Sequence, residues 1–87
     1  MKEVKMFMME TCPHCKKAFL IMEEICKEHP EYKAVKIEKI DESKQADYAA
    51  EFDYHYVPTF YVGGVKIHEG IPSKDALKEV YAEAVKD

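Results

Sequence analysis

The 87-residue chain has no tryptophan, three glycines, four prolines and three cysteines. Three cysteines are too few, and odd in number, for the disulfide framework of a small secreted domain. No apolar run approaches the roughly 18 residues of a membrane-spanning helix, and the first nine residues lack the apolar segment of a secretory signal peptide. No internal repeat, low-complexity segment or linker interrupts the chain. These absences predict a soluble, cytoplasmic protein that does not contact a membrane.

The chain also lacks an excess of basic residues: 13 lysines and arginines stand against 17 aspartates and glutamates, for a formal net charge of −4. An acidic chain has no basic face for a nucleic acid, so we expect no nucleic-acid partner. Hydrophobic residues make up 47% and charged residues 34%, which is an ordinary globular balance. This length needs no more than one domain, so we predict a single domain over residues 1–87.

Hydrophobic periodicity predicts four strands and three helices in the order βαβαββα. The expected elements are a strand at 2–9, a helix from Pro13 to Pro30, a strand at 32–41, a helix at 44–52, strands at 58–62 and 65–69, and a helix at 71–87. The helical connection predicts that the first two strands are parallel, whereas Gly63 and Gly64 predict a tight hairpin between the last two. The fold class is therefore α/β, with a mixed four-stranded sheet flanked by three helices.

Side-chain spacing places several residues within these elements. In the helix after Pro13, seven residues form a stripe that faces the core: Cys15, Ala18, Phe19, Ile21, Met22, Ile25 and Cys26. We expect Cys26 to be a buried structural thiol. Ser73 is the expected N-cap of the last helix. His68, on the last strand, alternates outward and is predicted to be solvated.

The sequence Cys12-Pro13-His14-Cys15 lies at the junction between the first predicted strand and the first predicted helix. Pro13 fits the first helical turn, because its missing N–H would have no partner there. Cys12 then lies at the helix N-terminus, where the helix dipole stabilises a thiolate. Cys15 lies one turn further on, on the core-facing stripe. This arrangement predicts an exposed nucleophile and a shielded resolving thiol, with the His14 imidazole further stabilising the Cys12 thiolate.

A metal site is the main alternative for a cysteine pair with this spacing. Zinc takes four ligands, usually from a second pair downstream, and the remaining candidates lack such spacing: His14, Cys26, His29, His55 and His68. We therefore predict no metal site within one chain. Two alternatives stay open, a metal site that shares Cys12 thiolates between two chains and a purely structural subunit.

Three segments together resemble the thioredoxin/glutaredoxin superfamily: TCPHC after the first strand, YVPTFYVGG before the hairpin, and EGIPSKDAL at the last helix. They span essentially the whole chain in the family's order. The resemblance implies a minimal thioredoxin fold and a thiol–disulfide oxidoreductase whose only redox group is a Cys12–Cys15 disulfide.

The resemblance also implies a role for the segment around Val57 and Pro58. In that superfamily the corresponding proline is cis and faces the active-site disulfide. The Val57 backbone would then lie beside Cys12, where it can pair with an extended peptide or with glutathione. The implied substrate-binding residues are Thr11, Val57, Pro58 and Thr59, and the implied catalytic residues are Cys12, Pro13, His14 and Cys15.

The chain departs from both branches of the superfamily. Thioredoxins usually carry a tryptophan where this chain has Thr11 and a buried aspartate where it has Met6. Glutaredoxins usually carry a glutathione-pairing lysine where this chain has Met9. Disulfides of this kind range from about −270 mV in thioredoxin to about −120 mV in DsbA, whose Pro-His dipeptide this chain shares. We expect this pair on the oxidising side of thioredoxin.

These observations predict a monomeric oxidoreductase that acts on protein or small-molecule disulfides through a mixed disulfide on Cys12. Two electron donors are consistent with the sequence, a flavoprotein of the thioredoxin-reductase type and glutathione. The absence of lysine at Met9 favours the flavoprotein. A glutathione-dependent glutaredoxin, with glutathione as co-substrate, is the alternative within this class. The alternative from another class is a metal or iron–sulfur module that shares Cys12 across a dimer.

Overall fold

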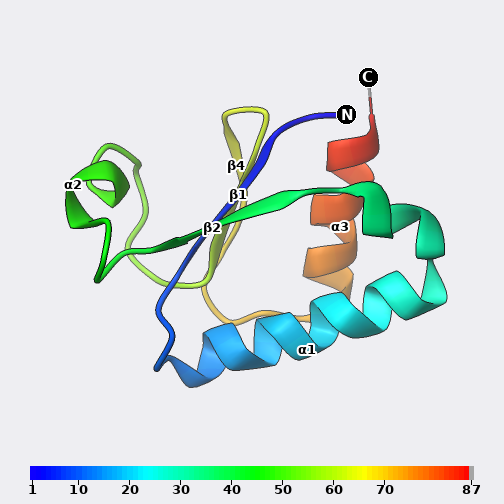
Figure 1. The fold of residues 1–87 in the computed structure, drawn as a ribbon, viewed down its shortest axis with the longest axis horizontal. Coiled ribbons are helices and arrows are strands. Elements are labelled where there is room, and N and C mark those ends of the chain that lie inside the picture. The colour runs from blue at the N-terminus through cyan, green and yellow to red at the C-terminus, as the bar shows by residue number, and fades with distance from the viewer. Residues whose placement is uncertain (87) are drawn as a thin grey trace.

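The apolar segment VKMFM forms β1 (Val4–Met8), an inner strand of a four-stranded sheet ordered β2-β1-β3-β4 (Figure 1). β2 (Ile37–Asp41) pairs with it in parallel and β3 (Thr59–Val62) pairs antiparallel on its other side. β4 (Val65–Glu69) completes a hairpin with β3. This computed structural model describes residues 1–86. The predicted mixed sheet, with its parallel first pair, is confirmed.

Three α-helices flank the sheet, as the sequence predicts (Figure 1). α1 (Pro13–Glu28) and α3 (Lys74–Val85) pack on one face, because their apolar stripes share a buried cluster with residues of β1 and β3. The short α2 (Ala46–Ala49) packs on the opposite face, where its Ala49 joins a second cluster. The two faces follow from the strand period of two.

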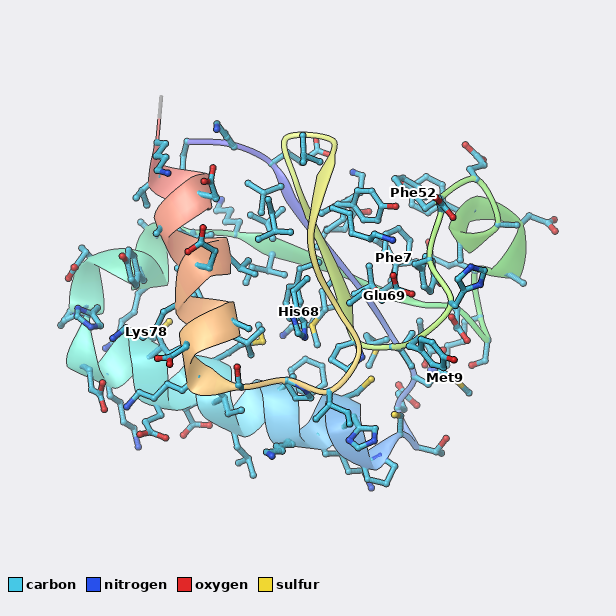
Figure 2. All side chains as sticks on the ribbon, turned by 180° about the vertical axis from the view of Figure 1, so that it is seen from behind. Phe7, Met9, Phe52, His68, Glu69 and Lys78 are labelled. Carbon is cyan, nitrogen blue, oxygen red and sulfur yellow. The ribbon has the colours of Figure 1, made fainter. Side chains whose placement is uncertain are left out.

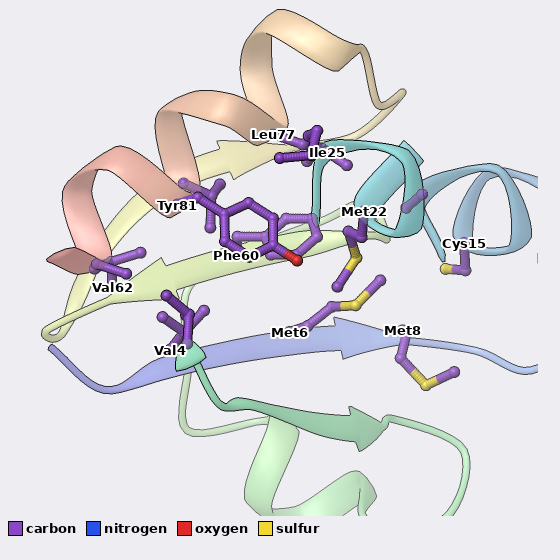
Figure 3. Packing of buried hydrophobic residues seen from close by; sticks show 14 residues of the cluster. Val4, Met6, Met8, Cys15, Met22, Ile25, Phe60, Val62, Leu77 and Tyr81 are labelled. Carbon is purple, nitrogen blue, oxygen red and sulfur yellow. The ribbon is translucent and has the colours of Figure 1, made fainter. Parts of the chain in front are cut away.

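The larger cluster lies between the sheet and the pair α1 and α3 (Figure 3). Met6 and Met8 enter it from β1, and Met22 enters it from α1, with the Cys15 thiol at the end nearest the start of that helix. Methionine fills irregular gaps well because its side chain is unbranched and flexible. The core therefore reaches directly beneath the cysteine pair.

The second cluster is aromatic and surrounds Phe7, which has no solvent exposure. Its ring centroid lies 4.6–6.5 Å from the centroids of four other rings: Tyr48, Phe52, Tyr54 and Tyr61. Such pairs add stabilisation beyond the area that they bury. Phe7 thus fixes α2 and the loop that follows it against the sheet.

Two segments differ from the sequence prediction. Residues Pro30–Ala34 form a 3-10 helix, η1, whereas we expected a strand from residue 32, so β2 begins only at Ile37. The physical reason is a tertiary contact, because Tyr32 stacks on Tyr81 of α3 at 5.2 Å. The helix expected at 44–52 is shorter, and only Ala46–Ala49 is α-helical. Ser73 caps α3 as predicted, accepting a hydrogen bond from the Ala76 N–H.

Two side-chain predictions are also corrected. His68 is half-buried, because a register shift between Phe60 and Tyr61 turns it onto the Phe60 ring, and it hydrogen-bonds with the Gly70 carbonyl. Cys26 is only partly buried and makes a hydrogen bond with the Tyr81 hydroxyl at 3.6 Å.

No helix within residues 1–86 combines the length and the apolar character that crossing a membrane requires.

Replacing Phe7 tests the aromatic cluster. Phe7→Ala should lower the free energy of unfolding by about 3–5 kcal/mol, because it leaves a cavity among the four surrounding rings. The measurement is equilibrium denaturation by urea. Leu20→Ala is the control, since Leu20 is 69% exposed and should change stability by less than about 0.5 kcal/mol. Equal losses in the two variants would show that this face is not a core.

Candidate active site

Cys12 is the N-cap residue of α1, with an extended backbone (φ −80°, ψ 122°), and Pro13 occupies the first helical position. The Cys12 carbonyl accepts the first N–H groups of the helix, from Cys15 and Lys16, both at 3.1 Å. The thiol of Cys12 is therefore held at the positive end of the helix dipole. The start of the helix lies where the sequence predicts it.

The two thiols of the pair differ in exposure. Cys15 has no solvent exposure, whereas Cys12 is partly exposed. Both are free thiols in this structure, as is Cys26. A reagent from solvent can therefore reach the sulfur of Cys12 and not that of Cys15.

The pKa of Cys12 is lowered below the ordinary value of a thiol. Partial burial opposes this shift, but hydrogen bonds from the backbone N–H groups of Cys15 and His14 and from the Cys15 thiol outweigh it. In this structure His14 contributes to that shift through its backbone N–H, and a role for its imidazole stays a prediction. The ring itself is exposed and faces the hollow described below.

Burial raises the pKa of Cys15 to about 11. A hydrogen bond from the Met9 backbone N–H opposes the rise, and the neighbouring Cys12 and the carboxylate of Glu42 add to it. Cys12 therefore ionises more readily than an ordinary thiol, whereas Cys15 stays a shielded, protonated thiol at neutral pH. This is the chemical asymmetry that two-step thiol–disulfide exchange requires.

Val57, in the loop before β3, lies near the start of α1, since it lines a hollow together with His14, and the Val57–Pro58 peptide bond is cis. The neighbouring backbone groups have partners, since the Tyr56 carbonyl accepts from Thr59 Oγ1 and the Pro58 carbonyl accepts from the Gly70 N–H at 3.0 Å. Among the hydrogen bonds of residues 1–86, none uses the N–H or C=O of Val57. These two groups are available to a ligand.

A largely apolar hollow of about 390 Å³ joins this loop to the start of α1, and it is lined by His14, Tyr56, Val57, Gly70 and Ile71. Tyr56 and Ile71 are 70% and 67% exposed, which is unusual for side chains of their size. The sequence did not identify Gly70 and Ile71 as site residues. Their only sequence signal is their place in EGIPSKDAL, between the last strand and the last helix.

The remaining predicted site residues differ in their exposure to solvent. Thr11 is exposed in the turn before Cys12, and Pro13 is exposed at the helix start. Pro58 and Thr59 are buried, so Thr59 acts on the site only by holding the Tyr56 carbonyl. The start of α1 thus brings Cys12, His14 and Cys15 together, and the shared hollow adds Val57 to this site.

Asp41 is a supporting residue that the sequence did not reveal. It is 8% exposed at the end of β2, where its carboxylate accepts from the Ser43 hydroxyl and N–H and from the Glu10 N–H at 3.3 Å. The bonds from Ser43, ahead of that from Glu10, lower the pKa of Asp41. The turn that leads into Cys12 is therefore attached to the sheet through this carboxylate.

Within residues 1–86, no group of three or more histidine, cysteine, aspartate or glutamate side chains is arranged to hold a metal ion. A larger hollow of about 670 Å³ lies among Met1, Val4, Ala34 and Ile37. Those residues belong to the N-terminal ends of β1 and β2, whereas Cys12 follows the C-terminal end of β1. The cysteine pair and this larger hollow thus lie at opposite ends of the sheet.

Comparison with known proteins agrees with this geometry, because the family model described as Thioredoxin matches residues 3–83. The chain belongs to the thioredoxin family. It is 34% identical over 77 residues to a thioredoxin of Methanocaldococcus jannaschii, covering 88% of each chain. This family member is accordingly a thiol–disulfide oxidoreductase, and the curated names of its relatives are thioredoxin rather than glutaredoxin.

Solved structures show the same fold. Oxidised mitochondrial thioredoxin 3 from Saccharomyces cerevisiae is 26% identical and superposes with a TM-score of 0.71, covering 94% of this chain and 77% of that one. Oxidised thioredoxin from Plasmodium falciparum is 22% identical and superposes with a TM-score of 0.70, covering 98% of this chain and 82% of that one. The predicted minimal thioredoxin fold is confirmed.

The asymmetry of the thiols predicts two separate titrations in the reduced protein. The Cys12 midpoint should lie below that of an ordinary thiol and the Cys15 midpoint near 11. The measurement is the pH dependence of the cysteine Cβ chemical shifts by NMR. In Cys12→Ser the Cys15 midpoint should fall, because a neighbouring negative charge is gone, yet stay above the ordinary value because Cys15 is buried. Coincident midpoints in the unaltered protein would contradict this prediction.

Proposed function

We propose that Cys12 is the nucleophile and Cys15 the resolving thiol of this thioredoxin-family protein. The observation that carries the proposal is the pairing of an accessible thiol of lowered pKa with a buried thiol of raised pKa on one helical turn. A thiolate, not a thiol, attacks a disulfide, so the thiol with the lower pKa begins the reaction.

The reaction takes place in two exchanges. The Cys12 thiolate attacks one sulfur of the substrate disulfide, forms a mixed disulfide and expels the other sulfur as a thiolate, which takes up a proton. Cys15 then loses its proton and attacks the Cys12 sulfur, which releases the second substrate thiolate and closes the Cys12–Cys15 bond. Two electrons pass to the substrate, and an external reductant returns them to the pair.

We propose proteins with accessible disulfides as the substrates. An extended segment beside the reacting sulfur can pair with the free N–H and C=O of Val57. Its apolar side chains can enter the hollow beside Tyr56 and Ile71. In this arrangement the exposed Thr11 lies at the rim, while the buried Pro58 and Thr59 anchor the chain that follows Val57, Thr59 through its bond to the Tyr56 carbonyl.

A flavoprotein of the thioredoxin-reductase type is the proposed electron donor. The names of the relatives support it, as does the partly buried Met9 at the position of a glutathione-pairing lysine. Activity that depends on glutathione would favour the glutaredoxin alternative instead. A coloured, metal-loaded dimer would favour the iron–sulfur alternative. We further propose that residues 1–87 act as one domain, as a monomer and in the cytoplasm.

Serine variants separate the roles of the cysteines. Cys12→Ser should abolish insulin reduction, whereas Cys15→Ser should accumulate a mixed disulfide with insulin because the second exchange is missing. Mass spectrometry without reductant detects the adduct. Cys26→Ser is the matched control. Cys26 lies in the last part of α1, where it bonds with Tyr81 of α3, so this variant should retain activity. Full activity of Cys12→Ser would contradict the assignment.

The redox potential provides a second test. Stabilising the Cys12 thiolate stabilises the dithiol, so the midpoint should lie above the value of about −270 mV for thioredoxin. Equilibration in a series of glutathione buffers, followed by thiol trapping, gives the midpoint. A value at or below that of thioredoxin would show that the stabilised thiolate does not set the potential.

A further inference from the structure

Glu69, the last residue of β4, reaches the backbone of the loop that precedes Val57. Its Oε2 atom accepts hydrogen bonds from the backbone N–H groups of His55 and Tyr56, the latter at 3.0 Å. Figure 2 shows Glu69 near the aromatic cluster around Phe7, on the side of the sheet that carries this loop. One carboxylate oxygen thus holds two successive residues of the loop.

A defect in the hairpin orients this carboxylate. In a regular strand, residues three apart point to opposite faces of the sheet. The register shift between Phe60 and Tyr61 places Lys66 opposite Tyr61 and Glu69 opposite Thr59, so both lie on the α2 face. Lys66 Nζ can therefore pair with Glu69 Oε1 at 2.7 Å, and it also donates to the Asp53 carbonyl at 3.2 Å.

Glu69 and Lys66 form an ion pair, called the clasp below, in which the carboxylate of Glu69 is ionised. The ion pair with Lys66, followed by the two backbone N–H groups, lowers the pKa of Glu69 to about 2. The side chain of Glu69 is 20% exposed, so it is only partly screened by solvent. The carboxylate is therefore charged at every pH at which the thiols react.

The clasp acts on the residues that flank the free backbone of Val57. Glu69 holds the Tyr56 N–H, Thr59 holds the Tyr56 carbonyl, and Gly70 holds the Pro58 carbonyl. Tyr56 and Gly70 also line the apolar hollow. The Val57 N–H and C=O thus stand between anchored neighbours, and ordering them in advance reduces the cost of pairing with a substrate.

We propose that Glu69 is a positioning residue for substrate binding, whose carboxylate holds residues 55 and 56 so that the Val57 backbone is presented to an extended segment of a protein disulfide. This inference rests on the proposed function of the Cys12–Cys15 pair. Glu69 bonds the loop and not the thiols, so it affects the binding of extended substrates and not the chemistry of sulfur exchange.

Glu69→Ala tests this role by removing the acceptor. The KM for insulin should rise about tenfold, because a loop that the carboxylate no longer holds must be ordered when the substrate binds, while kcat stays within about twofold. The rate with 5,5′-dithiobis(2-nitrobenzoate), a small disulfide without a backbone to pair, should not change. The Cys12 pKa should also stay the same. A merely structural role would not separate the two substrates in this way.

Two variants and a control refine the test. Glu69→Gln should retain most of the affinity, because one amide oxygen can accept both N–H groups. Glu69→Asp keeps the charge, but its shorter side chain moves the carboxylate away from the two N–H groups, so the KM for insulin should rise severalfold. This variant tests the positioning role if Glu69→Ala does not fold. Glu83→Ala is the control. Glu83, on α3, pairs with Lys86 at 2.9 Å, and the two residues are three apart in the sequence, as Lys66 and Glu69 are. The side chain of Glu83 is 24% exposed, similar to that of Glu69.

The outcomes distinguish the two proposals. An unchanged KM for insulin in Glu69→Ala and Glu69→Asp overturns the positioning role and leaves the roles of the cysteines intact. An equal loss of rate with insulin and with the small disulfide, or a shifted Cys12 pKa, overturns the positioning role as well, because Glu69 then acts through the thiols. If the unaltered protein reduces neither disulfide, the proposed function itself fails.

Discussion

The rest of the structure depends on β1, which is buried on both faces and paired with another strand along both edges. Met6 and Met8 face α1, and Phe7 faces the aromatic cluster. Parallel pairing with β2 and antiparallel pairing with β3 fix its position in the sheet. Since the chain passes from Met8 to Cys12 in four residues, this strand determines where the thiols lie.

The chemistry of the site follows from a balance between burial and backbone dipoles. Desolvation opposes ionisation of both thiols. At Cys12 the N–H groups at the start of α1 outweigh it, whereas at Cys15, one turn deeper, burial prevails. One helix therefore supplies both the activated thiol and the protected thiol, and the family's usual buried aspartate is replaced by Met6 in the core.

Much of this arrangement could be predicted from the sequence, because the determinants are local. Pro13 marks the start of α1, the helical period places Cys15 inward, and Ser73 caps α3. The 3-10 helix at Pro30–Ala34 could not be predicted, because it depends on Tyr32 meeting Tyr81 from a distant helix.

The surroundings of β4 could not be predicted either. An alternating pattern gives no sign of the register shift, and that shift decides which way His68 and Glu69 point. The same holds for Asp41, whose partner Glu10 lies 31 residues away along the chain. Contacts of this kind depend on the path of the whole chain rather than on local propensity.

The register shift has a consequence for self-association. β4 and β2 are the outer strands of the sheet, and the open hydrogen-bonding groups of outer strands invite edge-to-edge aggregation. On β4 the shift interrupts the regular ladder and Lys66 adds a charge, while β2 carries the exposed charges of Glu38 and Lys39. Both edges are thus poor templates for another strand, which disfavours growth of the sheet into fibrils.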